Sequence, residues 1–100
     1  MKGIRKATVS GRCLSQTGLP GEPFHGTIQV EYRDECMYFG WRIHDEDGEF
    51  LGEHWRPVSL RVIPEGDDPF EYALSLALEG MRRYRIGRKR AFLVENVKWK

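Results

Sequence analysis

The residues with the clearest chemical potential form a dense basic cluster. Residues 82–90 hold six cations in nine positions: Arg82, Arg83, Arg85, Arg88, Lys89 and Arg90. Phosphate binding is one interpretation, because the counterion release that drives polyanion binding scales with the number of cations involved. A second is local, because cations at a helix end compensate the helix dipole and can pair with acidic residues of the same chain. The cluster therefore predicts contact with a polyanion or an acidic partner, or a purely structural role.

Specific reading of nucleic-acid bases is not expected. No aromatic-rich RNA-binding strand accompanies the cluster, and one helix after a sheet is not the element order of a helix-turn-helix or of a double-stranded RNA-binding domain. Nucleic-acid binding without sequence preference, through residues 82–90, is an alternative function.

Candidate anchors for a protein contact lie elsewhere. Tyr72 and Leu76 are one turn apart and off the main apolar stripe of the expected helix, and Trp55 precedes Arg56 and Pro57 where a strand is expected to break. Exposed aromatic side chains beside arginine are typical anchors of protein interfaces. The alternative is that the edge of the sheet simply covers them. The candidate binding residues are thus Trp55, Arg56, Tyr72 and the six cations of residues 82–90.

No group of residues has the spacing of a catalytic or metal site. His25, His44 and His54 share no spacing typical of metal ligands or acid–base catalysis, and no serine or cysteine is recognisably paired with them. The acidic residues 45–49 lack the ligand spacing and distal glutamate of an EF-hand, so we expect a solvated hairpin turn there. We predict a protein that is not an enzyme and that has no metal or cofactor.

The elements that position these residues begin with alternating strands. Residues 4–14 alternate polar and apolar side chains in a period of two, and residues 15–25, with two prolines and two glycines, predict a loop of about eleven residues. Residues 28–32 and 37–43 then read as a hairpin around a turn at 33–35, and an Asp-Gly turn at 45–48 leads to a strand from residue 49 to 55. Pro57 is expected to interrupt pairing, with residues 58–62 as a bent continuation or a separate edge strand.

One helix is predicted over residues 69–85. Asp68 is a good N-cap, Pro69 suits the first helical position, Glu71 completes a capping-box spacing, and Gly87 can end the helix. A final strand from 90 to 99 has apolar residues in both phases, as in an interior strand covered on both faces. The expected fold is α+β: an antiparallel meander of five to six strands, one helix packed on one face, and a last strand after the helix.

Composition is that of an ordinary globular protein. The 100 residues fit one domain spanning residues 1–100, and they are 40% hydrophobic and 31% charged. No stretch is long and apolar enough to cross a bilayer or to act as a signal peptide, and Cys13 and Cys36 lack the spacing of a disulfide framework. We therefore expect a cytoplasmic protein that does not contact membranes. Residues 1–30, 31–71 and 72–100 carry net charges of +3, −8 and +6, which predicts a bipolar surface.

Two resemblances bear on function. The run of residues 40–52, the helix with Glu71, Ala73 and Leu78, and residues 91–96 resemble the three-strand, helix, strand half of a ribonuclease H-like domain over roughly residues 26–96. That resemblance implies two-metal hydrolysis by carboxylates on the first strand, the helix and the following strand. The matching positions offer Glu71 and Glu95, with Asn96 where an aspartate is expected and no aspartate on the first strand. A divergent hydrolase is thus a minor alternative.

The size, the sheet-then-helix order and the Asp-Pro cap are also similar to small phage proteins that block bacterial CRISPR complexes. This resemblance implies an inhibitor that occupies a nucleic-acid channel or a subunit surface. The leading hypothesis is a non-catalytic binding protein, of phage origin, that modulates a host nucleic-acid-handling complex through a protein contact.

Overall fold

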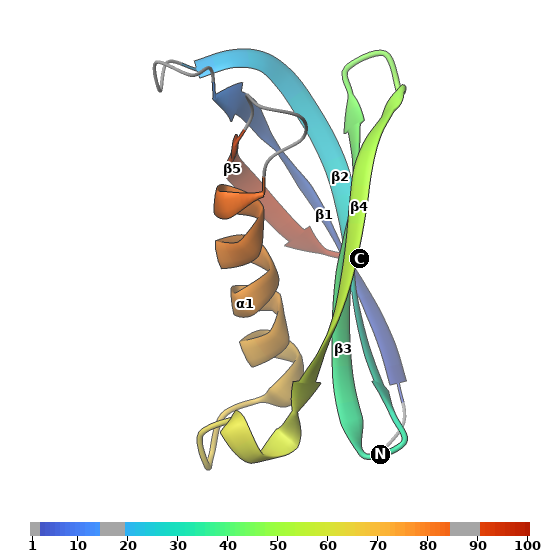
Figure 1. The fold of residues 1–100 in the computed structure, drawn as a ribbon, viewed down its shortest axis with the longest axis vertical. Coiled ribbons are helices and arrows are strands. Elements are labelled where there is room, and N and C mark those ends of the chain that lie inside the picture. The colour runs from blue at the N-terminus through green and yellow to red at the C-terminus, as the bar shows by residue number, and fades with distance from the viewer. Residues whose placement is uncertain (1–2, 15–19, 85–90) are drawn as a thin grey trace.

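A computed structural model describes residues 3–14, 20–84 and 91–100, and shows a sheet with one long helix on it (Figure 1). The elements are β1 (Gly3–Leu14), β2 (Pro20–Arg33), β3 (Cys36–Asp45), β4 (Phe50–Ser59), the short 3₁₀ helix η1 (Leu60–Val62), α1 (Pro69–Arg83) and β5 (Ala91–Trp99). The strand order is β4-β3-β2-β1-β5, and every pairing is antiparallel. The expected α+β meander is confirmed, with five strands and with the helix between the fourth and the fifth.

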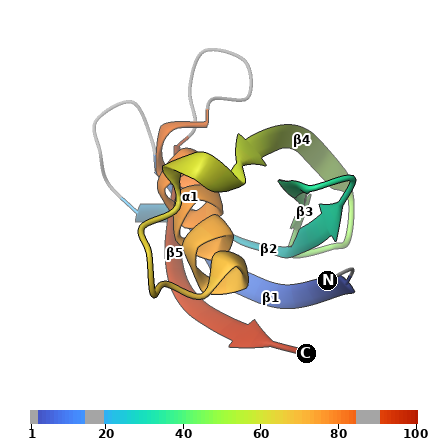
Figure 2. The same cartoon turned by 90° about the horizontal axis from the view of Figure 1, so that it is seen from below.

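Only one face of the sheet carries the helix. The sheet is twisted, and α1 lies against its concave face (Figure 2). The concave face holds the apolar half of each alternating strand, including the buried side chains of Val9, Ile28, Phe39, Trp41 and Ile43. The opposite face carries the polar half, and none of the described helices lies on it. This one-sided covering is what an antiparallel sheet with alternating strands allows.

The predicted loop at residues 15–25 is wrong over its second half, because β2 already begins at Pro20. Pro23 pairs with Arg12 of β1, whereas pairing with β3 starts only at Phe24. Residues 20–23 therefore have a neighbour on one side only, and a proline there can turn its missing amide to the unpaired side. The other residues of the expected loop, 15–19, lie outside the described residues.

Both hairpin turns form as predicted. Asp34 and Glu35 connect β2 to β3 with φ angles of 50° and 60°, the left-handed conformation that a two-residue hairpin turn requires. In the turn between β3 and β4, Gly48 has φ of 86°. There the Asp45 carboxylate accepts hydrogen bonds from the backbone N–H groups of Asp47 and Glu49, at 2.9 and 2.8 Å.

Pro57 does not interrupt β4, contrary to the sequence-based prediction. It pairs with Tyr38, and the strand continues to Ser59 before the chain turns into η1. β4 is the outer strand of the sheet, so the nitrogen of Pro57 can face the side on which no strand pairs. Leu60 and Val62 belong to η1 and are not a further strand.

α1 begins as its sequence predicts and ends slightly earlier. Asp68 is the N-cap, and its carboxylate accepts a 2.8 Å hydrogen bond from the Phe70 N–H. The Glu71 carboxylate does not complete a capping box, because it accepts instead from the indole N–H of Trp99, at 2.7 Å. The helix ends at Arg83 with Tyr84 as C-cap, and Gly87 lies outside the described residues.

β5 is an edge strand with a bulge, not an interior strand covered on both faces. Val94 pairs with Gly11 and Asn96 with Ser10, so Glu95 is the extra residue. One extra residue reverses the phase of the alternation. Phe92 before the bulge and Trp99 after it therefore face the same side, which accounts for the mixed apolar pattern. The strand pairs only with β1, which lies outside the region of resemblance to ribonuclease H.

Within the described part of the chain, no helix combines the length and the apolar character needed to span a membrane.

Candidate functional site

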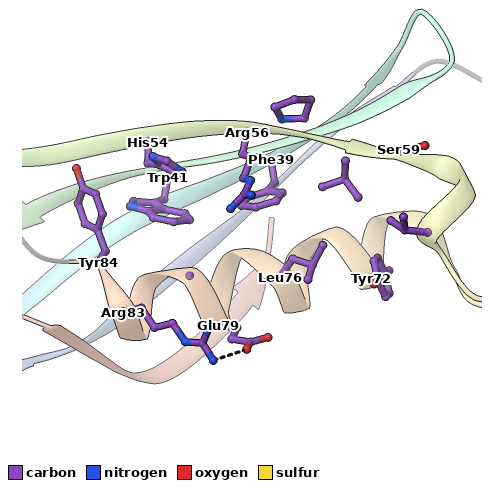
Figure 3. Close-up of a pocket in the computed structure, with 14 residues that line it drawn as sticks. Phe39, Trp41, His54, Arg56, Ser59, Tyr72, Leu76, Glu79, Arg83 and Tyr84 are labelled. Atoms are coloured by element: carbon purple, nitrogen blue, oxygen red, sulfur yellow. Dashed lines mark ion pairs between the residues drawn. The ribbon is translucent and has the colours of Figure 1, made fainter.

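The main candidate site is a groove of about 640 Å³ between α1 and the β3–β4 side of the sheet (Figure 3). We call it the α1–β4 groove. Its floor is Phe39 and Trp41 of β3, and its walls are formed by β4 and η1 on one side and by α1 with its C-cap on the other. The wall residues are His54, Arg56, Pro57, Val58, Ser59, Val62, Tyr72, Leu76, Glu79, Gly80, Arg83 and Tyr84. The volume lies in the usual range for binding sites, about 300 to 1,000 Å³.

The floor is aromatic and tightly packed. The rings of Phe39 and Trp41 stack with centroids 6.1 Å apart. Trp41 also meets the edge of Tyr84 at 5.4 Å and the imidazole of His54 at 4.8 Å. Four rings from β3, β4 and the end of α1 thus form a single cluster along the groove.

The indole N–H of Trp41 has no acceptor among the described residues, although only 3% of Trp41 is exposed. A buried donor without an acceptor costs about 1 to 3 kcal/mol, so native proteins keep few of them. In the floor of a groove, this N–H is a candidate donor to an acceptor atom of a ligand.

Gly80 brings the helix onto the indole. A Cβ at this position would lie 2.8 Å from Cη2 and 3.1 Å from Cζ3 of Trp41, closer than carbon atoms normally approach. The absence of a side chain at Gly80 therefore sets the depth of the groove at its centre.

Most polar groups around the groove have a partner, but the His54 imidazole and the Arg56 guanidinium have no hydrogen bond or ion pair among the described residues. The Tyr84 hydroxyl donates to the Glu53 carbonyl oxygen at 3.0 Å, which joins the end of α1 to β4. Arg83 pairs with Glu79 at 3.0 Å. Arg56 points from β4 into the groove beside Phe39 (Figure 3), and none of the described residues forms an ion pair or hydrogen bond with its guanidinium. The groove thus has one uncompensated cation.

Some predicted binding residues meet in this groove and others do not. Arg56, Tyr72 and Arg83 line it together, with Leu76. Trp55 is 47% exposed on the opposite face of the sheet, where its ring lies across Gly40. A Cβ at Gly40 would collide with that ring, so the Trp55 ring packs directly on the β3 backbone at Gly40. Adjacent residues of a strand point to opposite faces, and Trp55 and Arg56 therefore cannot form one anchor.

The basic cluster is only partly described. Arg82 and Arg83 are exposed at the end of α1, and both border a second hollow, of about 720 Å³, with Leu78, Val94 and Val97. Arg85, Arg88, Lys89 and Arg90 lie outside the described residues.

Sequence reasoning missed the residues that define the groove. Phe39 and Trp41 enter the sequence-based prediction only as part of the expected strand 37–43, and His54 and Tyr84 belong to none of the predicted sites. The period of two in residues 54–58 was the available signal, because it places His54, Arg56 and Val58 on the face of Trp41. The sequence does not show that α1 leaves this part of the face uncovered.

The other polar candidates do not come together in one site, and the His44 Nδ1 is buried without a hydrogen-bond partner among the described residues. His25 and His44 stack with ring centroids 5.6 Å apart, far along β2 and β3 from residue 54. The carboxylates that a hydrolase would need are dispersed. Glu71 accepts from Trp99, and Glu95 lies 4.0 Å from Arg12 in an ion pair. No group of three metal-ligating side chains occurs among the residues with described positions.

Comparisons with protein-family profiles, with curated proteins and with solved structures find no match for this chain.

Proposed function

We propose that the protein is a non-catalytic binding protein that acts by contact with a partner protein, and that the α1–β4 groove is the contact site. The observation that carries the proposal is the buried, unpartnered indole N–H of Trp41 in a groove whose rim presents Arg56 without a counterion. Tryptophan, tyrosine and arginine are the residues that dominate binding energy in protein interfaces. Three of the predicted binding residues, Arg56, Tyr72 and Arg83, support the same site.

The resemblance to small phage inhibitors suggests the class of partner, which is a host complex that handles nucleic acid. This partner class stays a hypothesis. Under it, the groove would hold part of a subunit, and binding would block that subunit's surface. Sequence-nonspecific nucleic-acid binding through residues 82–90 stays an alternative, and the same experiment separates the two.

The experiment is site-specific photocrosslinking in cells of the native host. A photoreactive amino acid replaces Val62, which is 60% exposed on the rim of the groove. The matched control places it at Ile4, a similar aliphatic residue that is 56% exposed on the opposite face of the sheet. We expect a protein adduct from position 62 that survives nuclease treatment, is absent from position 4 and is lost with Arg56→Glu.

Equal adducts from both positions, or none from position 62, would remove the groove as the contact site. An adduct that disappears on nuclease treatment would favour the nucleic-acid alternative.

A further inference from the structure

The unused polar groups of the α1–β4 groove define what its ligand must supply. Tyr84 already donates to Glu53, Arg83 is paired with Glu79, and the Ser59 hydroxyl oxygen accepts from the Arg61 N–H at 3.2 Å. Besides the His54 imidazole, which can donate or accept, the unused groups are the Trp41 indole N–H and the Arg56 guanidinium, which have no acceptor among the described residues. Both are donors, so the complementary ligand is rich in acceptors, and carboxylates match a guanidinium best.

The shape of the groove indicates an extended ligand. On the helix side the groove runs from Tyr72 to Tyr84, twelve residues along α1 and its cap. At about 1.5 Å per residue this is about 18 Å. An extended peptide rises about 3.3 Å per residue, so about five residues span it. The rim comes from β4, η1 and α1 and is exposed at Arg56, Val62 and Arg83, which suits a chain segment lying along it.

We infer that the groove recognises a short, extended, acidic segment of a partner protein. An apolar side chain of that segment packs on Phe39 and Trp41, a carboxylate pairs with Arg56, and an acceptor atom takes the Trp41 N–H. This inference rests on the proposed function and names the chemistry of the partner.

Reaching the Trp41 N–H requires a rearrangement within the ring cluster. The nitrogen is solvent-inaccessible, and three rings pack on Trp41: the buried Phe39 beside it in the floor, and His54 and Tyr84 from the walls. Tyr84 is tied to Glu53, whereas no described residue bonds to the His54 side chain. The His54 ring is therefore the one that moves when the segment binds.

The test is a titration of the ¹⁵N-labelled protein with the peptide acetyl-Asp-Phe-Glu-Leu-Asp-amide, followed by NMR. Each tryptophan has its own indole N–H signal. The Trp99 N–H donates to the Glu71 carboxylate, so its signal serves as an internal control. We expect the Trp41 indole and Arg56 Nε signals to shift together, while those of Trp99 and Trp55 stay. The same peptide with Asn and Gln in place of its acids should bind at least about tenfold more weakly.

Arg56→Gln should also weaken binding about tenfold, because it removes the charge at an exposed position that the fold does not need. Arg61→Gln is the matched control, since Arg61 is an exposed cation on η1 that does not line the groove. Raising the salt concentration from about 50 to 300 mM should weaken the wild-type complex by screening.

Four outcomes would overturn the inference. The neutral peptide could bind as well as the acidic one, or 4-phenylbutyrate alone could bind as tightly as the peptide, which would make the ligand a small molecule. Signals of the groove could instead shift on raising the protein concentration alone, which would make the occupant the acidic turn of a second copy, next to the exposed Phe50. A groove adduct in the crosslinking experiment without peptide binding would leave the proposed function standing and remove only this ligand chemistry.

Discussion

Gly80 of α1 lies directly against the Trp41 ring of the sheet, at the groove. The benzenoid edge of the indole occupies the space that a side chain at position 80 would need. A glycine inside a helix costs about 1 kcal/mol relative to alanine, so its presence here indicates a packing requirement.

We predict that Gly80→Ala destabilises the protein by about 1 kcal/mol. The new methyl group forces the helix or the Trp41 ring to move, which costs about 1 to 3 kcal/mol, and the better helix propensity offsets about 1 kcal/mol of that. Urea unfolding measures the change, and Ser75→Ala at an exposed position of the same helix is the control, expected to change stability little. A Gly80→Ala protein as stable as the wild type would contradict the close approach.

At the scale of elements, the bulge in β5 decides which side chains of this strand face the helix. Without the extra residue Glu95, either Phe92 or Trp99 would point away from the helix. The bulge lies opposite Gly11, where a Cβ would collide with the backbone carbonyl of Leu93. Gly11 therefore lets the two backbones pack closely at this point.

We expect Gly11→Ala to destabilise the protein by at least about 2 kcal/mol, because the obstacle is backbone and cannot rotate away. Gly3→Ala on the same strand is the control, since its Cβ would meet only Phe70 at an ordinary distance of 3.5 Å. Unfolding midpoints of both variants, with amide exchange across residues 91–99, measure the effect. Equal stability of the two variants would show that β5 can shift to accept the methyl group.

At the scale of the whole molecule, the strands of the sheet differ in how many neighbouring strands cover their backbone. β1, β2 and β3 each have a strand on both sides, whereas β4 and β5 are outer strands. The centre of the sheet carries fully buried side chains at Ala7, Ile28 and Val30. The side of β4 next to the groove has no strand beside it and is held at Glu53 by Tyr84.

Hydrogen exchange should follow this arrangement. We predict the slowest amide exchange in β2 around Ile28 and Val30, and faster exchange in β4, because local opening needs fewer contacts to break at an edge. Exchange followed by NMR under native conditions gives the order directly. Protection of β4 equal to that of β2 would mean that another segment or a second copy covers this edge. Adding the acidic peptide should slow exchange at residues 54–58 and leave β2 unchanged.

Local signals were sufficient for most of the fold. The period of two in residues 4–14 and 37–43, the Asp-Gly turn and the Asp68–Pro69 helix start are decided by neighbours in the chain, and each formed as predicted. These features depend on side chains within a few residues of one another, which the sequence displays directly.

The remaining features were decided by the tertiary structure. Pro23 and Pro57 are accepted inside strands because each lies where the ladder has a neighbour on one side only, and strand order is a property of the whole sheet. The groove joins Trp41, Arg56 and Tyr72, which are at least fifteen residues apart in sequence. Its existence depends on which part of the sheet α1 covers, and that depends on packing between distant segments, which no local pattern encodes.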